Sequence, residues 1–430
     1  MGTQRRDVST RRMGTLISMG AVAAVSVTGC AGGVSSGGAG SGVAGQGFEY
    51  GAAQEEVDRI IEDLDPVTLR FQPVAASPTS IASPAGTVLK EMVEERSGGK
   101  IEVEIVWGQA IAGYADIPDA LADGRLDLAY DIPTYSPAEF PAVDDLATTT
   151  ALLPSSPYLG EFLPHAVYND IGWTNQAVLD EYEARGVVPL TPFIPSAGYY
   201  MFCSESAALD GDWRGTQVRI GSAAQSSMTQ DLGAAPVSME HTEVYEALQR
   251  GTVDCNLGPA AVSAESGLVE VGAHVGFTTD VSFPRAAGAF LAGSSFNDLP
   301  LAYQQIVFDS NALASGGVVK GQTDGAAEVV RQAKEHGGGV VALDEDTQGA
   351  LKDASESLTD EAVGNGRVDA DIAATIAESV DRWVSELEEA GFADQGDTES
   401  FDEWYDDSAD FNEFARLVYE SSAAMEHRPS

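Results

Sequence analysis

From about residue 66 onward, apolar and polar positions follow the periods of strands and helices in turn. Residues 67–71 and 101–107 alternate between apolar and polar side chains, as half-buried strands do. Between them, residues 86–95 repeat apolar side chains at helical spacing, and the Ser-Gly-Gly run at 97–99 predicts the end of that helix. A strand, a helix and a strand in this order predict a mainly parallel sheet with helices as crossover connections.

Two separate stretches, 121–127 and 248–254, share one pattern. Each reads as the end of a helix, with Gly124 or Gly251 at the left-handed capping position, followed by a strand that carries an Asp near its start. Two copies of this joint predict two similarly built α/β lobes. The alternative is the chance recurrence of a common helix-to-strand connection.

The first residues have the pattern of an export signal. Four arginines precede an apolar run at 16–27, which is shorter than the roughly 20 residues that span a bilayer core. Residues 27–30, Val-Thr-Gly-Cys, resemble the lipobox of bacterial lipoproteins, which predicts a signal peptide over 1–29 and a lipid on Cys30. The alternative is an ordinary signal peptide in which Cys30 has no role, and the export route stays open.

A Gly/Ser-rich stretch follows this cysteine. It cannot pack into a core, so residues 30–65 are predicted to be a flexible tether between the membrane and the folded body. Residues 40–45 match the GxGxxG pattern of dinucleotide-binding folds, but no strand precedes them and no helix follows. That match therefore reflects composition alone.

The composition narrows the choice of partners. The 430 residues include 67 Asp plus Glu but only 23 Lys plus Arg, for a formal charge of -44 at pH 7. A chain this acidic repels nucleic acids and the anionic surface of a bilayer, so we expect no nucleic-acid partner and a membrane contact only through the lipid. An apolar content of 43% over this length suffices for two ordinary hydrophobic cores.

Sequence motifs for catalysis or metal binding are not found. The five His residues have no metal-ligand spacing and no motif that links them to a nucleophilic Cys, and there is no GxSxG elbow or Walker-type loop. The acidic cluster at 344–346 lacks the spaced oxygen pattern of a calcium loop. We therefore expect no enzyme, no cofactor and no metal, with a bilobal hydrolase as the alternative from another class.

The stretch at 242–254, Thr-Glu-Val-Tyr-Glu-Ala-Leu-Gln-Arg-Gly-Thr-Val-Asp, resembles a characteristic helix and strand of the solute-binding proteins of TRAP transporters, the tripartite ATP-independent importers. Shorter similar stretches follow in the same order within residues 66 to 390. They are 97–101, 108–109, 124–130, 215–220 and 299–300. The resemblance implies a bilobal α/β fold of the type II periplasmic-binding-protein class, in which two lobes joined by crossing hinge strands close over a ligand.

The same resemblance implies how the chain divides. Lobe one would contain residues 66–197 plus 284–323, and lobe two would contain 198–283 plus 324–392. The acidic, aromatic-rich extension at 393–430 lies beyond the body of the family. We expect it to form a helix packed on the body, because aromatic side chains seldom decorate a free tail, and the alternative is a partner-facing extension.

The resemblance also assigns binding residues. In the family, the Arg that matches Arg219 pairs with the substrate carboxylate, whose two oxygens a planar guanidinium meets at once. The alternative is a strand-edge Arg paired with a surface acid. Tyr200 stands where the family often has a second Arg, and Gly258 stands where an Asn is common. Together with Asn256, these two residues are expected to line the ligand site. These changes disfavour the commonest dicarboxylate and sugar-acid ligands and favour a less polar or aromatic acid.

Other candidates lie where ligands of open α/β sheets usually bind, at strand ends. Gln72, Asp131 and Arg285 each follow an expected strand or crossing segment, although each also fits a surface position. If Asp131 and Arg219 both face the ligand, a zwitterion or an amino-acid derivative is favoured, because a carboxylate repels acids and attracts amines. Aromatic residues expected near the cleft, with core packing as the alternative, are Trp107, Tyr135, Tyr199, Tyr200 and Phe283.

Cys203 and Cys255 match neighbouring strands of the family, and export permits their oxidation, so either a disulfide or two buried thiols is expected. The resemblance as a whole predicts a monomeric lipoprotein anchored to the outer face of the bacterial cytoplasmic membrane. It would deliver a small organic acid to the small and large TRAP membrane subunits. The alternative within the same fold is a binding protein that serves a sensor or another importer.

Overall fold

The computed structural model describes residues 45–239 and 241–430, so the predicted signal peptide 1–29 and Cys30 lie outside the described residues. The described strands form two separate sheets, one with the order β2-β1-β3-β10-β4 and one with the order β11-β9-β5-β8-β6-β7. The strands of the first sheet are β1 (Val67–Gln72), β2 (Ile101–Ile105), β3 (Leu128–Asp131), β4 (Val187–Pro195) and β10 (Ala287–Gly293). The strands of the second sheet are β5 (Tyr199–Cys203), β6 (Gln217–Ile220), β7 (Ala235–Ser238), β8 (Cys255–Pro259), β9 (His274–Phe277) and β11 (Gly339–Ala342).

Both sheets combine parallel and antiparallel pairs. Strand β1 runs parallel to β2 and β3, as the strand-helix-strand pattern predicts, whereas β10 runs antiparallel to β3 and β4. In the second sheet β6 runs parallel to β7 and β8, and β5 runs antiparallel to β8 and β9. The carboxyl ends of β6 and β8 therefore share one edge of the sheet with the first residue of β5.

The chain passes between the sheets in short extended segments. One segment follows β4 and leads to β5, and another leads from β9 back to β10, which enters the first sheet between β3 and β4. The two crossing segments contact each other, because the Ser196 N–H donates a hydrogen bond of 2.9 Å to the carbonyl of Ala286. Such paired crossing segments are the expected hinge of a bilobal protein.

The repeated joint of the sequence has the same structure in both sheets. The Asp127 N–H donates to the Arg70 carbonyl at 3.1 Å, and the Arg70 N–H donates back to Oδ2 of Asp127 at 2.8 Å. In the second sheet, Asp254 exchanges the same two hydrogen bonds with Gln217, at 2.8 Å and 2.7 Å. Each Asp therefore holds the neighbouring parallel strand at the residue just before the pairing of the two strands begins, which gives the shared sequence pattern a shared structural cause.

Helices cover the sheets. Those that the following text uses are α2 (Pro84–Arg96), α5 (Leu159–Thr174), α9 (Ala260–Glu265), α10 (Leu301–Glu335), α13 (Phe401–Trp404) and α14 (Phe411–Ser421). The other α-helices are α1 (Gln54–Ile61), α3 (Ile117–Ala122), α4 (Pro141–Thr148), α6 (Gln176–Ala184), α7 (Ala223–Asp231), α8 (Val244–Gln249), α11 (Glu345–Gly364) and α12 (Ile372–Glu389). The prediction of a tether over 30–65 is wrong for its described part, because Phe48 and the apolar side chains Val57 and Ile61 of α1 are buried in a hydrophobic core.

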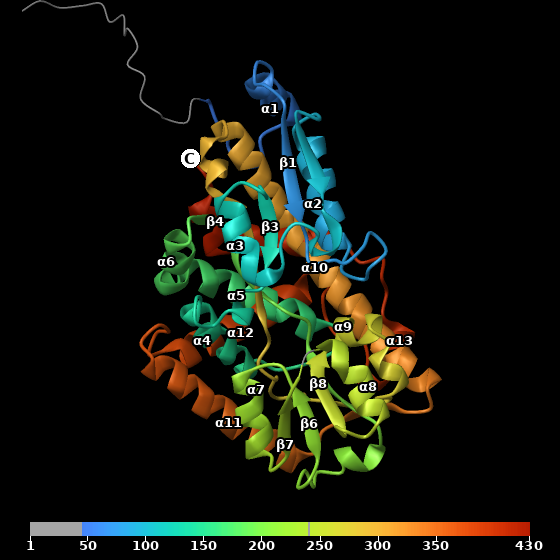
Figure 1. Cartoon of the computed structure of the whole chain (residues 1–430). Helices are drawn as coiled ribbons and strands as arrows, with labels where there is room; N and C mark the ends of the chain where they lie inside the picture. The colour runs from blue at the N-terminus through green and yellow to red at the C-terminus, as the bar shows by residue number, and fades with distance from the viewer. Residues whose placement is uncertain (1–44, 240) are drawn as a thin grey trace, which may run out of the picture. The chain divides into compact units, whose positions relative to one another are not determined.

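Helix α10 is 35 residues long and contacts helices that belong to both sheets (Figure 1). One is α2, which connects β1 and β2 of the first sheet, and another is α9, which follows β8 of the second. Two glycines permit the close approach. A Cβ on Gly317 would lie 2.6 Å from the carbonyl oxygen of Pro84, and a Cβ on Gly325 would lie 2.4 Å from the Cα of Ala261. One rigid helix thus packs backbone against backbone at two distant points.

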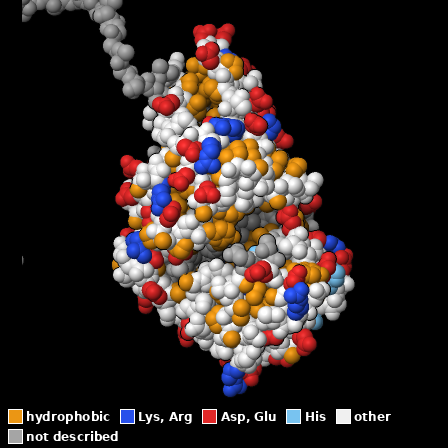
Figure 2. All heavy atoms as spheres, in the orientation of Figure 1, with side chains coloured by type: hydrophobic (Ala, Val, Ile, Leu, Met, Phe, Trp, Pro, Cys, Tyr) orange, Lys and Arg blue, Asp and Glu red, His pale blue; other side chains and the backbone are white. Residues whose placement is uncertain are grey.

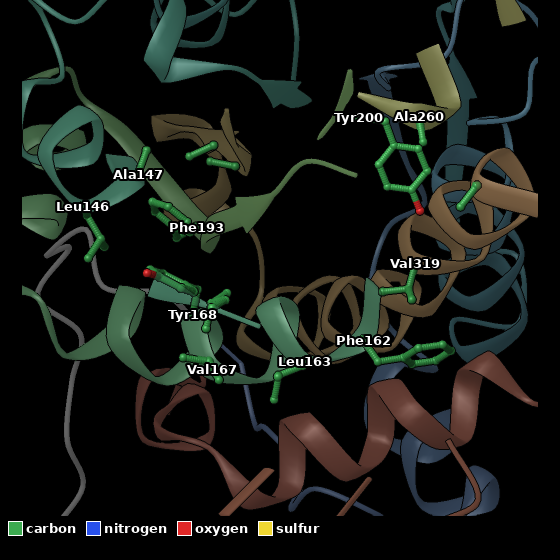
Figure 3. Packing of buried hydrophobic residues seen from close by; sticks show 14 of the residues in the cluster. Leu146, Ala147, Phe162, Leu163, Val167, Tyr168, Phe193, Tyr200, Ala260 and Val319 are labelled. Carbon is green, nitrogen blue, oxygen red and sulfur yellow. The ribbon is translucent and has the colours of Figure 1, made fainter. Parts of the chain in front are cut away.

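The main hydrophobic core surrounds α5. Phe162, Leu163, Val167 and Tyr168 of this helix lie among buried side chains that include Phe193 of β4 (Figure 3). The rings of Tyr168 and Phe193 stack with centroids 5.1 Å apart. Figure 3 also labels Val319 of α10 and Tyr200 of β5, which belong to the same cluster, so the core continues from the first sheet to the second.

The acidic C-terminal extension packs on this core through its aromatic side chains. Phe411 and Phe414 of α14 contact the ring of Phe162, with centroids 5.5 Å and 4.9 Å apart. Asp410 caps α14 by accepting the N–H groups of Asn412 and Glu413. The extension therefore contains a helix docked on the body, and most of its acidic side chains are exposed, whereas Asp394 accepts the Tyr158 N–H and Asp402 pairs with Lys334.

Candidate functional site

Arg219 of β6 is the centre of the candidate site. Its side chain is 8% exposed. Nε and Nη2 donate to the carbonyl oxygen of Met239 at 3.1 Å and 3.0 Å, and Nη1 lies 3.5 Å from Oδ1 of Asn256. A Cβ on Gly221 would lie 3.7 Å from both Nη atoms, an ordinary contact distance, so the guanidinium lies directly beside Gly221 at the carboxyl edge of the sheet.

Two buried polar groups point to the same place. Asn256 of β8 pairs in register with Arg219, and its Nδ2 has no hydrogen-bond partner among the described residues. The same holds for Oγ of Ser263 on α9. A Cβ on Gly258 would lie 2.6 Å from that Nδ2 and 3.4 Å from that Oγ, so both groups converge above Gly258. A buried donor without a partner costs about 1–3 kcal/mol, which makes this pair a candidate for ligand recognition.

His241 is a neighbour of Arg219 that sequence reasoning missed. Burial, with a smaller contribution from the charge of Arg219, lowers the pKa of the imidazole below its usual value. The ring is therefore neutral at physiological pH, and Nε2 lies 3.3 Å from Oγ of Ser266. Arg219 is thus the permanent positive charge in this group of side chains.

Tyr199 and Gln225 lie at the same edge. Burial raises the pKa of Tyr199, while a hydrogen bond with Gln225 and the charge of Arg219 act in the opposite direction. Gln225 accepts the Gly221 N–H through Oε1 and donates through Nε2 to the carbonyl of Pro284. This amide joins the carboxyl end of β6 to the second crossing segment, so the site and the hinge are in direct contact.

The first sheet contributes an acid. Asp131, the last residue of β3, is 1% exposed, and its Oδ1 accepts the Ile132 N–H at 2.8 Å. Burial raises the pKa of this carboxyl group to about 7, with a small further rise from Glu139 and no offsetting cation. Asp131 forms no salt bridge with any residue in the part of the chain that the structure describes.

Tyrosines connect the two halves of the site. Burial raises the pKa of Tyr130, and the neighbouring Tyr114, Tyr135 and Asp131 of the first half and Tyr199 of the second raise it further. The rings of Tyr114 and Tyr135 meet edge to face, with centroids 5.6 Å apart. In the space-filling view, the visible surface is hollowed between the part that contains β3 and the part that contains β6 and β8 (Figure 2). Asp131 and Arg219 therefore lie on the two sides of a group of tyrosines.

The comparison with known families decides the classification. The model of bacterial extracellular solute-binding protein family 7, DctP, matches residues 71–365. The chain belongs to this family. A curated relative, a solute-binding protein of Verminephrobacter eiseniae, is 26% identical over 52% of this chain and 64% of its own length. The chain spans less than two thirds of the length of this and three further curated relatives that it matches, one of them the C4-dicarboxylate-binding periplasmic protein DctP of Rhodobacter capsulatus.

Solved structures share the fold. A marine metagenome TRAP solute-binding protein specific for aromatic acids, in complex with metahydroxyphenylacetate, has a TM-score of 0.60 and 20% identity, over 74% of this chain and 99% of its own. The periplasmic ectoine-binding protein of the TeaABC TRAP transporter of Halomonas elongata has a TM-score of 0.58 and 17% identity, over 75% of this chain and 100% of its own. The resemblance to TRAP solute-binding proteins and the bilobal α/β fold are thereby confirmed, and the hydrolase alternative is set aside because the family consists of binding proteins.

Two predicted binding residues of this family 7 protein are engaged elsewhere. Gln72 is fully buried, its Oε1 accepts the Ile111 and Ala112 N–H groups, and its Nε2 donates to the Ala112 carbonyl, so it fixes a loop rather than presenting an amide to a solute. Tyr200 pairs in register with Gly258, but its ring packs in the core near Val319 (Figure 3). The structure therefore favours Tyr199 over Tyr200 as the neighbour of Arg219.

The other predicted aromatic residues divide between core and surface. Phe283 is 1% exposed and packs in the core of the second sheet, whereas Tyr135 is 62% exposed. Trp107 is half-buried. Of the three, Tyr135 lies at the candidate site, because its ring contacts Tyr114, a neighbour of Asp131.

Arg285 belongs to a buried ion pair that the sequence did not predict. Its Nη1 lies 3.3 Å from Oε2 of Glu161, and the two side chains are 2% and 1% exposed. Nη1 and Nη2 also donate to the carbonyls of Ser196 and Gly160, and both carboxylate oxygens of Glu161 accept the Gly198 N–H. This network ties both crossing segments to α5, and it engages the guanidinium of Arg285 in this structure.

Cys203 and Cys255 form a disulfide in the structure. They lie opposite each other on the antiparallel strands β5 and β8, and both are fully buried. Among the described residues, no group of three or more His, Cys, Asp or Glu side chains is arranged to hold a metal ion. Nor does any described helix have the length and apolar character that a membrane span requires.

Proposed function

We propose that the protein is the extracytoplasmic solute-binding component of a TRAP transporter and captures a small organic acid by closure of its two lobes. The observation that carries this proposal is the buried guanidinium of Arg219 beside Nδ2 of Asn256 and Oγ of Ser263, neither of which has a hydrogen-bond partner among the described residues. Together they offer one charged and two neutral hydrogen-bonding groups to a carboxylate. A carboxylate there would satisfy groups that are otherwise costly to bury.

The division into lobes is part of the proposal. Lobe one comprises 66–197 plus 284–323, lobe two comprises 198–283 plus 324–392, and 393–430 is a docked extension. A ligand that contacts both lobes stabilises the closed arrangement by the difference between its affinities for the closed and open states. The paired crossing segments and their contact with Gln225 support such a movement, because they join the hinge to the residues around Arg219.

The cellular setting is proposed from the sequence. A signal peptide over 1–29 and a lipid on Cys30 would anchor the protein to the outer face of the cytoplasmic membrane as a monomer. The small and large membrane subunits of the transporter would then accept the loaded form. Labelling with a radioactive fatty acid, compared between the wild type and Cys30→Ser, tests the anchor independently of ligand binding.

Thermal unfolding with a panel of carboxylic acids tests the binding function. A ligand present at 100 times its dissociation constant adds about 2.7 kcal/mol to the free energy of unfolding. Arg219→Ala should abolish the stabilisation by every acid that binds, whereas Arg214→Ala, which removes an exposed guanidinium of the same lobe, should leave it unchanged. Unchanged affinity of Arg219→Ala in calorimetry, with an intact circular dichroism spectrum, would show that the carboxylate binds elsewhere.

A further inference from the structure

We propose that the ligand is a zwitterion, a small molecule whose carboxylate binds at Arg219 and whose cationic nitrogen binds at Asp131 among the tyrosines of lobe one. This inference rests on the proposed function, since it assumes that a carboxylate binds at Arg219. It adds a second charged half-site and thereby names the class of ligand.

The carboxyl group of Asp131 is built into the protein without a cationic partner. Only 1% of the residue is exposed, and the hydrogen bond that the structure gives it is the Ile132 N–H on Oδ1. The titratable neighbours of Asp131 are Glu139, which raises its pKa, and three tyrosines whose pKa it raises, Tyr114, Tyr130 and Tyr182. No Lys, Arg or His of the described residues is among these neighbours. A buried charge is expensive unless it is paired, so a cationic group supplied by a ligand would stabilise this acid.

The aromatic surroundings fit a cationic nitrogen. The rings of Tyr114 and Tyr135 meet edge to face with centroids 5.6 Å apart, and both residues are close enough to Tyr130 to raise its pKa. The negative faces of aromatic rings attract cations, most strongly where water is excluded, and recognition of ammonium groups commonly uses several such rings. A carboxylate with tyrosines around it therefore suits an amine or a quaternary ammonium group better than it suits a second carboxylate.

The charges on the two sides of the site are opposite. Asp131 ends β3 in lobe one and Arg219 lies in β6 of lobe two, and the visible surface is hollowed between the parts that contain these strands (Figure 2). Tyr199, whose pKa the charge of Arg219 lowers, is also close enough to Tyr130, the neighbour of Asp131 in β3, to raise the pKa of Tyr130. A purely anionic ligand that bridges the lobes would place negative charge near Asp131, where burial weakens the screening by water. A zwitterion meets each charge with its opposite, so the pairing favours lobe closure by this class of ligand.

Pairs of ligands that differ only in the cationic nitrogen test this inference. The pairs are 4-aminobutyrate with pentanoate, glycine betaine with 3,3-dimethylbutanoate, and piperidine-4-carboxylate with cyclohexanecarboxylate. In each pair the carboxylate is kept, and a carbon replaces the nitrogen. We expect at least one cationic member to bind the full-length protein in calorimetry at pH 8, at least about tenfold more tightly than its carbon analogue.

The Asp131→Asn variant localises the effect. Its amide oxygen still accepts the Ile132 N–H, so the local backbone is kept, while the charge is removed. We expect this variant to lose the preference for the cationic member of the pair, with affinity for that member lowered at least about tenfold. Asp119→Asn, which removes an exposed carboxylate from the same lobe, should bind like the wild type.

Different outcomes refute the two proposals. If nitrogen-free acids bind through Arg219 and the carbon analogues bind as tightly as the cationic members, the proposed function stands and the zwitterion inference fails. An unchanged preference in Asp131→Asn also overturns the inference, because the cation then binds elsewhere. If no acid of either kind binds the wild type, the proposed function fails and this inference fails with it.

Discussion

Removal of the disulfide between Cys203 and Cys255 should cost the protein a large part of its stability. The two residues are 52 positions apart, and a crosslink of this span restricts the unfolded chain by an entropy that corresponds to about 4 kcal/mol at 25 °C. The two fully buried cysteines face each other on β5 and β8, in the sheet that carries Arg219 and Asn256. The crosslink therefore stabilises the scaffold of the site.

Urea unfolding of a Cys30→Ser chain measures this contribution. We expect the double variant Cys203→Ala/Cys255→Ala to unfold with a free energy about 4 kcal/mol lower than that of the oxidised protein. The reduced protein, which keeps both side chains but lacks the bond, is the matched control and should show a similar loss. A deficit in the double variant that exceeds the deficit of the reduced protein measures the cavity left by the sulfur atoms.

Two results would refute this reasoning. Thiol titration of the denatured, unreduced Cys30→Ser chain should find no free thiol, and two free thiols would show that the bond does not form. Equal unfolding free energies for the oxidised and reduced proteins would show that the crosslink restricts nothing in the unfolded chain.

Two further predictions concern buried charges. Glu161→Gln leaves the buried guanidinium of Arg285 without its carboxylate, so the free energy of unfolding should fall by about 3 kcal/mol or more in urea, whereas the exposed control Glu183→Gln should change little. Burial raises the pKa of Asp131 in the folded state to about 7, above its usual value of 3.8. Between about pH 4 and pH 7 the unfolded chain has therefore lost this proton while the folded protein still carries it, so the free energy of unfolding falls as the pH rises through this range. Asp131→Asn should therefore be more stable than the wild type at pH 8, by at most about 4 kcal/mol, and nearly equal to it at pH 4; a pH-independent difference in thermal unfolding would contradict this account.

The parts of the fold that the sequence predicted are those set by local chemistry. Period-two and helical patterns located β1, α2 and β2, because each buries one face against the core. Gly124 and Gly251 adopt the left-handed conformation with φ of 74° and 65°, as the repeated joint requires. The Asp that follows each glycine was part of the pattern, but its role in holding a neighbouring strand depends on pairing between distant segments.

The candidate site was predicted less completely, for the same reason. The Glu161–Arg285 pair joins residues 124 positions apart, and 67 acidic residues give any arginine many potential partners in the sequence. Gln72 looked available because it ends a strand, yet the loop at 111–112 takes its amide. The resemblance predicted Asn256 as a binding residue. That its Nδ2 is buried without a hydrogen-bond partner among the described residues depends on its packing beside Gly258 and Ser263, which only the folded chain brings together.

The net charge links the acidic composition to the class of ligand. At a formal charge of -44, the protein repels an approaching anion, and salt screens this repulsion because the Debye length falls to about 8 Å at physiological ionic strength. Association of a nitrogen-free acid should therefore become faster as salt is added, whereas a zwitterion with no net charge should associate at a nearly constant rate. Stopped-flow fluorescence with 4-aminobutyrate and pentanoate measures both rates on one protein. An association rate for the anion that falls with salt would mean that the local field of Arg219 outweighs the charge of the whole chain.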